Sequence, residues 1–275
     1  MFDATYVINL DRSVDRWAHA QRITALAGLP NVIRFSAVDG RALGAEGMEA
    51  LQRRGVLSTD LSRFSAGCFE GEIGCAVSHA LVLQDILDRG WRSALVLEDD
   101  VELSGDPATW RGRFQAAYRD LPRDWEAWYL YRCFDIEHRV RRLSPRTVVP
   151  WVPQGGAAYA LSASGAATFH RALVPVSNAV DRVYMDVVKS RAIKAFAASP
   201  LLIDPGVQPS VINLNNPSKE WVENGVNRPP EYWPVTHLAH LGESVPETPQ
   251  PLAARVWQAG TRTLGRLLGR RERTS

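Results

Sequence analysis

An apolar segment that runs directly into three acidic residues places the strongest constraint on the fold of this chain. Residues 94–97, Ala-Leu-Val-Leu, have the composition of a central strand that is buried on both faces of a parallel sheet. Glu98, Asp99 and Asp100 follow at once. Because ligands of open α/β sheets bind at the carboxyl ends of the strands, this segment predicts an α/β fold with a ligand site here.

The three adjacent carboxylates repel one another unless a cation neutralises them. If the strand geometry continues, Glu98 and Asp100 point to the same side. Such a pair suits a hard divalent cation that keeps several waters and bridges phosphates. From these residues alone, a solvated acidic junction between strand and loop remains open as the alternative.

Four further segments accompany this one and make the pattern specific. In chain order the five read INLDRSVDR (8–16), FSAVDG (35–40), GEIGCAVSH (71–79), LVLEDDVEL (95–103) and GGAAYALSASGAATF (155–169). Together they resemble glycosyltransferase family 25, which includes bacterial lipooligosaccharide galactosyltransferases and collagen galactosyltransferases. The resemblance covers roughly residues 4–215.

This resemblance implies a GT-A-like, Rossmann-related α/β fold: a mixed, mostly parallel sheet flanked by helices in one catalytic domain, residues 1–242. It also implies a metal-dependent, inverting hexosyltransferase that moves galactose from UDP-galactose to a lipopolysaccharide or lipooligosaccharide acceptor. A catalytically inactive scaffold that binds a nucleotide sugar is the alternative. A metal-dependent phosphohydrolase is a third reading, but the chain lacks the additional His and Asp ligands that two-metal hydrolysis usually needs.

The periodicity of apolar residues predicts the order of the elements. Strands are expected at 4–10, 31–36, 93–98, 127–132, 146–152, 156–162, 194–198 and 201–204. Helices are expected at 13–28, 44–54, 71–89, 107–120, 163–173 and 178–192. Alternating strands and helices at the start predict a parallel sheet, and the clustered later strands predict a mixed half. Segment 56–70 reads as a mobile loop.

The resemblance assigns the metal to two of the acids. Glu98 and Asp100 stand at the positions of the family's metal-binding motif, for Mn²⁺ or Mg²⁺, and Asp99 is expected to contact the sugar or ribose of the donor. The chain has Glu98 where a plain Asp-x-Asp motif has its first aspartate, so the exact set of metal ligands stays open. His237 or His240 is a candidate third ligand.

Polar residues after the first two strands, and small residues at the start of the 71–89 helix, form the expected donor site. Backbone N–H groups at a helix N-terminus approach anionic ligands closely. Each of these residues could instead have a structural role. The small residues could allow close packing of helix on sheet, Asp11 could be an acid at a helix N-cap, and Arg16 could form a surface ion pair. The donor-binding predictions are Asn9, Asp11, Arg12, Arg16, Asp39, Gly71, Glu72, Ser78, His79 and Asp99.

The acceptor side is predicted from the later motif. Gly155 and Gly156 permit a sugar to approach the backbone, and Tyr159 follows them. By analogy with inverting GT-A enzymes, Asp181 is the predicted catalytic base and Asp186 is the reserve candidate. An acid favoured by the helix dipole is the alternative reading of Asp181.

Composition restricts the remaining classes. The net charge of +2 argues against a strongly basic nucleic-acid binder. Three cysteines without a Cys-x-x-Cys or Cys/His pattern make a disulfide framework or a zinc site unexpected. No secretory signal and no membrane-spanning apolar stretch are evident, which predicts a cytoplasmic, bacterial protein.

The C-terminal region is predicted to be a separate element. Residues 243–251 are proline-rich and read as a linker, and residues 252–275 carry six Arg against one Glu. Apolar and basic residues fall on opposite sides of a helical wheel, which suits the anionic surface of a membrane. Binding at the inner face of the inner membrane would bring the enzyme to a lipid-linked acceptor. A helix packed on the body, whose net charge is −3, is the alternative.

Overall fold

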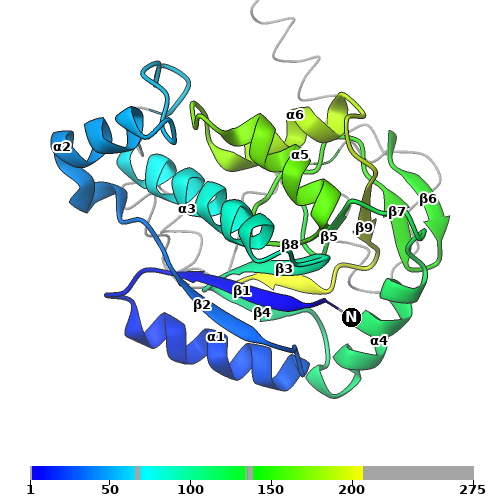
Figure 1. Ribbon diagram of the computed structural model, residues 1–275. Helices are drawn as coiled ribbons and strands as arrows, with labels where there is room; N and C mark the ends of the chain where they lie inside the picture. Colours follow the sequence, from blue (N-terminus) through cyan, green and yellow to red (C-terminus); the bar gives the residue numbers. More distant parts are fainter. Residues whose placement is uncertain (1, 66–68, 134, 136–138, 207–275) are drawn as a thin grey trace, which may run out of the picture.

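Successive residues of strand β1 (Ala4–Asn9) are packed against opposite layers of helices, and all six are buried. Tyr6 and Ile8 belong to one apolar core, whereas Val7 belongs to the other. This computed structural model describes residues 2–65, 69–133, 135 and 139–206. The described chain is a sheet between two helical layers (Figure 1).

The other elements have the following bounds. The strands are β2 (Val32–Ser36), β3 (Ser93–Glu98), β4 (Val101–Leu103), β5 (Ala127–Tyr129), β6 (Arg141–Ser144), β7 (Thr147–Val149), β8 (Ala158–Ser162), β9 (Ala195–Ala198) and β10 (Ile203–Pro205). The helices are α1 (Val14–Ala27), α2 (Gly40–Arg53), α3 (Phe69–Asp88), α4 (Pro107–Arg119), α5 (Ala163–Leu173) and α6 (Val180–Lys189).

The main sheet has the strand order β2-β1-β3-β8-β5-β9-β7-β6. Six of these eight strands run in one direction, and β8 and β7 run against them. This confirms the predicted α/β, GT-A-like sheet that is mixed and mostly parallel. Because β1, β2 and β3 are neighbours and parallel, Asn9, Ser36 and Glu98 end their strands at the same edge.

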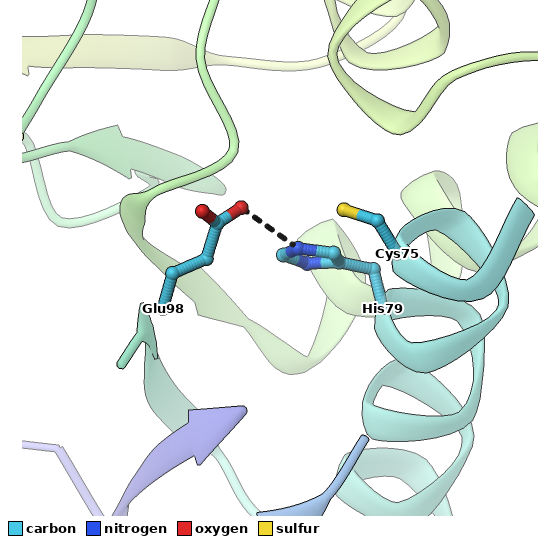
Figure 2. Close-up of side chains that lie close together, drawn as sticks. All are labelled: Cys75, His79 and Glu98. Carbon is cyan, nitrogen blue, oxygen red and sulfur yellow. Dashed lines mark ion pairs between the residues drawn. The ribbon is translucent and has the colours of Figure 1, made fainter. Parts of the chain in front are cut away.

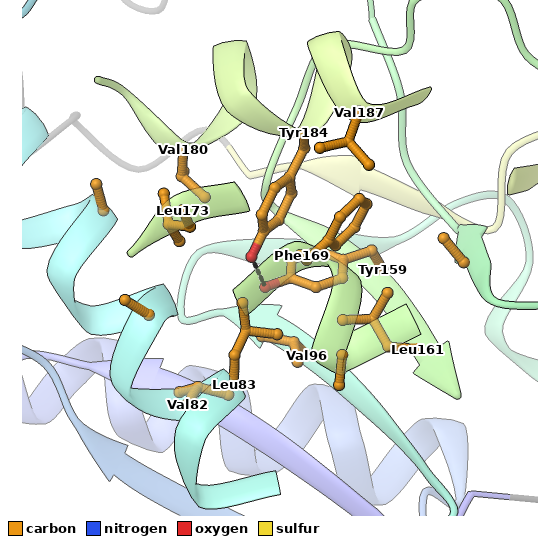
Figure 3. Packing of buried hydrophobic residues seen from close by; sticks show 14 of the residues in the cluster. Val82, Leu83, Val96, Tyr159, Leu161, Phe169, Leu173, Val180, Tyr184 and Val187 are labelled. Atoms are coloured by element: carbon orange, nitrogen blue, oxygen red, sulfur yellow. Dashed lines mark hydrogen bonds between the residues drawn. The ribbon is translucent and has the colours of Figure 1, made fainter. Parts of the chain in front are cut away.

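The two helical layers bury separate cores. Helices α3, α5 and α6 cover one face of the sheet, and α1 and α4 cover the other (Figure 1). In the first core the rings of Phe169 and Tyr184 stack with centroids 4.0 Å apart (Figure 3). In the second, Trp110 stacks on Phe114 and donates from its indole nitrogen to the Leu202 carbonyl.

A glycine pair brings the start of α2 against α3. A β-carbon on Gly74 would lie 2.6 Å from the backbone nitrogen of Gly40 and 2.6 Å from the carbonyl oxygen of Val38. Any larger residue at position 74 would push the two backbones apart. The pair therefore places the N-terminal half of α3 beside the carboxyl end of β2.

Most predicted elements agree with the structure to within a few residues, and three features differ. Strands β4 and β6 were not expected, because three or four residues with little apolar pattern carry no clear strand signal. Helix α2 begins at Gly40, capped by Asp39, and is interrupted at Gly44, whose φ and ψ are not helical, so the part after Gly44 corresponds to the predicted helix at 44–54. The loop at 56–65 is anchored by buried side chains of Leu57 and Phe64.

Some predictions fall on residues that the structure does not describe. The candidate ligands His237 and His240, the linker 243–251 and the basic segment 252–275 lie outside the described residues and stay predictions. No helix in the described ranges has both the length and the apolar character to cross a bilayer.

Candidate functional site

The acidic residues after β3 lie where α1 and β1 meet the same edge of the sheet. Arg16 on α1 donates to Asp99 at 2.7 Å and to Asp100 at 2.8 Å. Asn9, at the end of β1, donates to the other oxygen of Asp99 at 2.7 Å. The structure thus brings four predicted site residues into one hydrogen-bonded network.

Burial dominates the electrostatics of this network. It raises the pKa of Asp99, although the hydrogen bond from Asn9 and the charge of Arg16 oppose the shift. It raises the pKa of Asp100 to about 7, with a further contribution from Glu98 and an opposing one from Arg16. The negative charge of Glu98 thus adds to the effect of burial on the pKa of Asp100.

Asn9 is a supporting residue in this arrangement. Its side chain is buried, and its carbonyl oxygen accepts two hydrogen bonds from Arg34, at 2.9 and 2.7 Å. These bonds orient the amide so that its nitrogen points to Asp99. Asn9 thus has no exposed surface that could contact the sugar nucleotide, contrary to the direct contact predicted for it. Arg34 is a residue that the sequence did not single out.

A first pocket opens at this edge, between the ends of β1, β2 and β3 and the N-terminal half of α3. It encloses about 610 Å³ of space, part of which is open to solvent. Eight predicted site residues line it, namely Arg12, Arg16, Asp39, Gly71, Ser78, His79, Glu98 and Asp99. Apolar residues complete the wall, namely Ile8 in β1, Leu10 just after it, and Ala37 and Val38 in the β2–α2 turn.

Local contacts explain the shape of this pocket. Ser78 accepts from the backbone nitrogen of Val38 at 2.8 Å and donates to the Gly74 carbonyl at 2.6 Å, which ties α3 to the β2–α2 turn. At the rim, Arg12 forms an ion pair with Asp39. Asp11 accepts from Ser36 at 2.6 Å and is largely exposed outside the lining.

A second pocket adjoins the first. Its lining comprises Glu72, Cys75, Glu98, Gly156, Ala179, Val180 and Asp181. Cys75 and Glu98 line both pockets, so these two side chains form part of the wall between them. A molecule in the first pocket and another in the second would therefore meet at Glu98.

The predicted base lies in this second pocket, and the reserve candidate does not. Asp181, in the first turn of α6, accepts from Gln154 Nε2 at 2.8 Å. Asp186, one turn and a half later, is exposed and lines neither pocket. Gln154 is a further residue that the sequence did not single out.

The glycine pair before β8 shapes the same wall. A β-carbon on Gly156 would stand 3.6 Å from His79 Nε2 and 3.7 Å from Glu98 Oε1, so glycine keeps that space open. Gly155 has a φ of +124°, a backbone conformation that favours glycine, and does not line either pocket.

Tyr159 occupies a position behind the site. Its ring is fully buried, and its hydroxyl lies 2.7 Å from His79 Nδ1 and 3.2 Å from the hydroxyl of Tyr184 (Figure 3). Direct contact with an acceptor, as predicted, needs an exposed face that this ring lacks. Its hydrogen bond instead fixes the orientation of the His79 imidazole.

The carboxylate oxygens at the end of β3 are of the kind that bind a divalent cation. When all are ionised, Glu98, Asp99 and Asp100 carry three negative charges against the one charge of Arg16. Carboxylate oxygens are the ligands that Mg²⁺ and Mn²⁺ prefer. Of the two predicted ligands, Glu98 faces both pockets, while Asp100 is half-buried and bound to Arg16.

Fold and site together define a class, that of GT-A-like α/β proteins with an acidic strand end beside two adjoining pockets. Residues 2–120 match the family model described as "Glycosyltransferase family 25 (LPS biosynthesis protein)". The resemblance to family 25 that the five motifs predict is confirmed.

Curated relatives extend this match along the chain. The sequence is 29% identical over 223 residues to procollagen galactosyltransferase 1 of Danio rerio and 29% over 225 residues to procollagen galactosyltransferase 2 of Homo sapiens. It is also 29% identical over 227 residues to the human "Inactive glycosyltransferase 25 family member 3". Each match covers 74% of this chain but only 35–37% of the relative, so the chain spans little more than a third of their length.

Proposed function

We propose that this chain is a metal-dependent, inverting glycosyltransferase that moves galactose from UDP-galactose to a glycan acceptor of the lipopolysaccharide type. The observation that carries the proposal is the pair of adjoining pockets with Glu98 in the wall between them. One pocket lies at the strand ends where nucleotides bind in such folds, and the other holds an acid at a helix N-terminus.

The first pocket is the proposed donor site. Its apolar floor suits a uracil ring, and Arg12, Asp39 and Arg16 offer charged groups to ribose and diphosphate. Glu98 and Asp100 would hold Mn²⁺ or Mg²⁺, which supplies charge neutralisation for the departing diphosphate. Arg16 keeps Asp99 and Asp100 in a fixed arrangement, so the ligands need little reorganisation.

The second pocket is the proposed acceptor site. Asp181 would take the proton from the acceptor hydroxyl while that oxygen bonds to the anomeric carbon and the bond to the UDP oxygen breaks. One displacement of this kind inverts the anomeric configuration. Gln154 holds the Asp181 carboxylate in place, and Gly156 leaves room for the sugar beside Glu98.

The names of related proteins support the choice of substrates. Relatives described as procollagen galactosyltransferases favour galactose as the transferred sugar. The family model's description as an LPS biosynthesis protein favours a lipopolysaccharide acceptor. The proposed location, in the cytoplasm and at the inner face of the inner membrane, follows from that acceptor.

A nucleotide-sugar-binding scaffold is the second candidate function. It is favoured by the relatives described as inactive, and by the ion pairs that Arg16 makes with both Asp99 and Asp100. A scaffold would still bind the nucleotide sugar in the first pocket but would not catalyse its transfer.

Screening of UDP-sugars by UDP release in the presence of Mn²⁺ tests the proposal. The proposed transferase releases UDP from UDP-galactose when a glycan acceptor is added. A phosphohydrolase would release nucleotide without acceptor, and a scaffold would bind UDP-sugar and release none.

A further inference from the structure

A cysteine, a histidine and a glutamate converge in the wall between the two pockets. Cys75 and His79 stand four residues apart on α3, so they share one face of the helix, and both project toward Glu98 at the end of β3 (Figure 2). The ligand atoms of the three side chains all lie within 4.8 Å of one another.

One atom of this trio is buried without a hydrogen-bond partner. His79 Nε2 is fully buried and has no such partner among the described residues. It lies 3.5 Å from Glu98 Oε1, the ion-pair contact drawn in Figure 2, which does not have the geometry of a hydrogen bond. Leaving a buried polar atom unsatisfied costs free energy, so its position facing Glu98 calls for an explanation.

The other nitrogen of the ring is already engaged. Nδ1 is 2.7 Å from the hydroxyl of Tyr159, and the ring stacks against Tyr159 with centroids 5.7 Å apart. A histidine that ligates a metal through one nitrogen commonly uses the other to bind a supporting group. Tyr159 holds His79 in this way, with Nε2 directed at Glu98.

We propose that Cys75 Sγ, His79 Nε2 and Glu98 form a binding site for a zinc-class cation. Bonds of about 2.1 Å place two ligand atoms of a tetrahedral site about 3.4 Å apart, close to the 3.5 Å between His79 and Glu98. Cys75 completes the site by moving its thiol inward. The thiol proton leaves to solvent as the sulfur–metal bond forms, so binding releases one proton.

The surroundings favour a cation, and the thiol favours zinc. Besides Glu98, the acidic residues Glu72 and Asp181 line the second pocket together with Cys75. Thiolate and imidazole ligands select Zn²⁺ and Co²⁺ over Mg²⁺. The open space beside Gly156 leaves a fourth position for water.

The site has one consequence that rests on the proposed function. Glu98 belongs to both ligand sets, so a zinc-class ion on Cys75 and His79 removes a ligand from the proposed Mn²⁺ or Mg²⁺ site. Zn²⁺ then inhibits transfer. In Cys75→Ser, a given concentration of Zn²⁺ should remove a smaller fraction of the variant's own activity.

Titration of the full chain with Co²⁺, without donor or acceptor, tests the binding itself. The wild-type protein should develop the near-ultraviolet charge-transfer band of a cobalt thiolate and release one proton per metal. Zn²⁺ should abolish the band, whereas the same concentration of Mg²⁺ should not. Absence of the band would overturn the metal site and leave the transferase proposal standing.

Variants assign the band to these side chains. Cys75→Ser should lose it, whereas Cys133→Ser, at a buried cysteine whose thiol donates to the Gln154 carbonyl, should keep it. Glu98→Gln preserves the shape of the side chain and should weaken Co²⁺ binding about 10- to 100-fold or more. Circular dichroism shows whether each variant is folded. An undiminished band in Cys75→Ser, or unchanged affinity in Glu98→Gln, would refute the proposal.

Discussion

Gln154 donates a hydrogen bond of 2.8 Å to one carboxylate oxygen of Asp181, while the backbone nitrogen of Arg182 donates to the other at 2.8 Å. Both oxygens are thereby held at the edge of the second pocket. A carboxylate held in a fixed orientation at the edge of a pocket is well placed to accept a proton from a bound hydroxyl.

Replacing Asp181 by Asn should lower turnover by about 100- to 10,000-fold, the usual contribution of a general base. Asn keeps the size of the side chain and one acceptor oxygen, so the affinity for UDP should change little. Asp186→Asn, on the same helix but outside both pockets, is the matched control and should keep wild-type turnover. A large loss in the Asp186 variant alone would move the base to that residue.

Replacing Asp100 by Ala should abolish the metal-dependent part of UDP binding, because it removes a proposed ligand of the cation at the diphosphate. Calorimetry with UDP, with and without Mn²⁺, measures this difference. Asp124→Ala removes an exposed acid before β5, at the opposite edge of the sheet, and should bind like the wild type. If the Asp100 variant retains Mn²⁺-dependent binding, Asp100 is not a ligand.

Replacing Gly74 by Ala should destabilise the fold, since the new β-carbon would lie 2.6 Å from backbone atoms of Gly40 and Val38. Overpacking of this kind costs about 1–3 kcal/mol of unfolding free energy. Gly112→Ala is the control, because nothing lies within 4 Å of a β-carbon at that position in α4. It should stabilise the protein by about 0.5–1 kcal/mol. Denaturant unfolding measures the free energy of unfolding of both variants. Equal stability of the two would contradict the close approach of Gly74 to the backbone of Gly40 and Val38.

Deletion of residues 252–275 should abolish sedimentation with anionic liposomes. The segment carries a net charge of +5, and each basic residue near such a surface contributes about 1 kcal/mol. Transfer to a soluble acceptor should persist, since the proposed site lies within residues 8–181. Neutral liposomes are the control for both proteins. Equal binding of the truncated chain to anionic liposomes would exclude the membrane role.

The strand ends were predictable from sequence because their signal is local. The apolar run at 94–97 and the acids after it fixed both the strand and the edge at which Glu98 lies. The order of strands and helices followed from periodicity in the same way, and β8 appeared where the small residues after Gly156 predicted it.

The supporting contacts were not predictable, because they join residues far apart in the chain. Arg34 orients Asn9 across two neighbouring strands, and Gln154 reaches Asp181 across 27 positions. The proposed metal site of Cys75, His79 and Glu98 was missed for a related reason. The i, i+4 spacing of Cys75 and His79 is visible, but their convergence with Glu98 depends on how α3 packs on the sheet.

The acceptor dependence of UDP release tests the central claim most directly. UDP is measured at saturating UDP-galactose and Mn²⁺, with and without a lipooligosaccharide-type acceptor, and again after chelation of the metal. The account predicts UDP release that requires the acceptor, stops on chelation and is restored by Mn²⁺. Release at the same rate without acceptor, or no release by a protein that binds UDP, would contradict it.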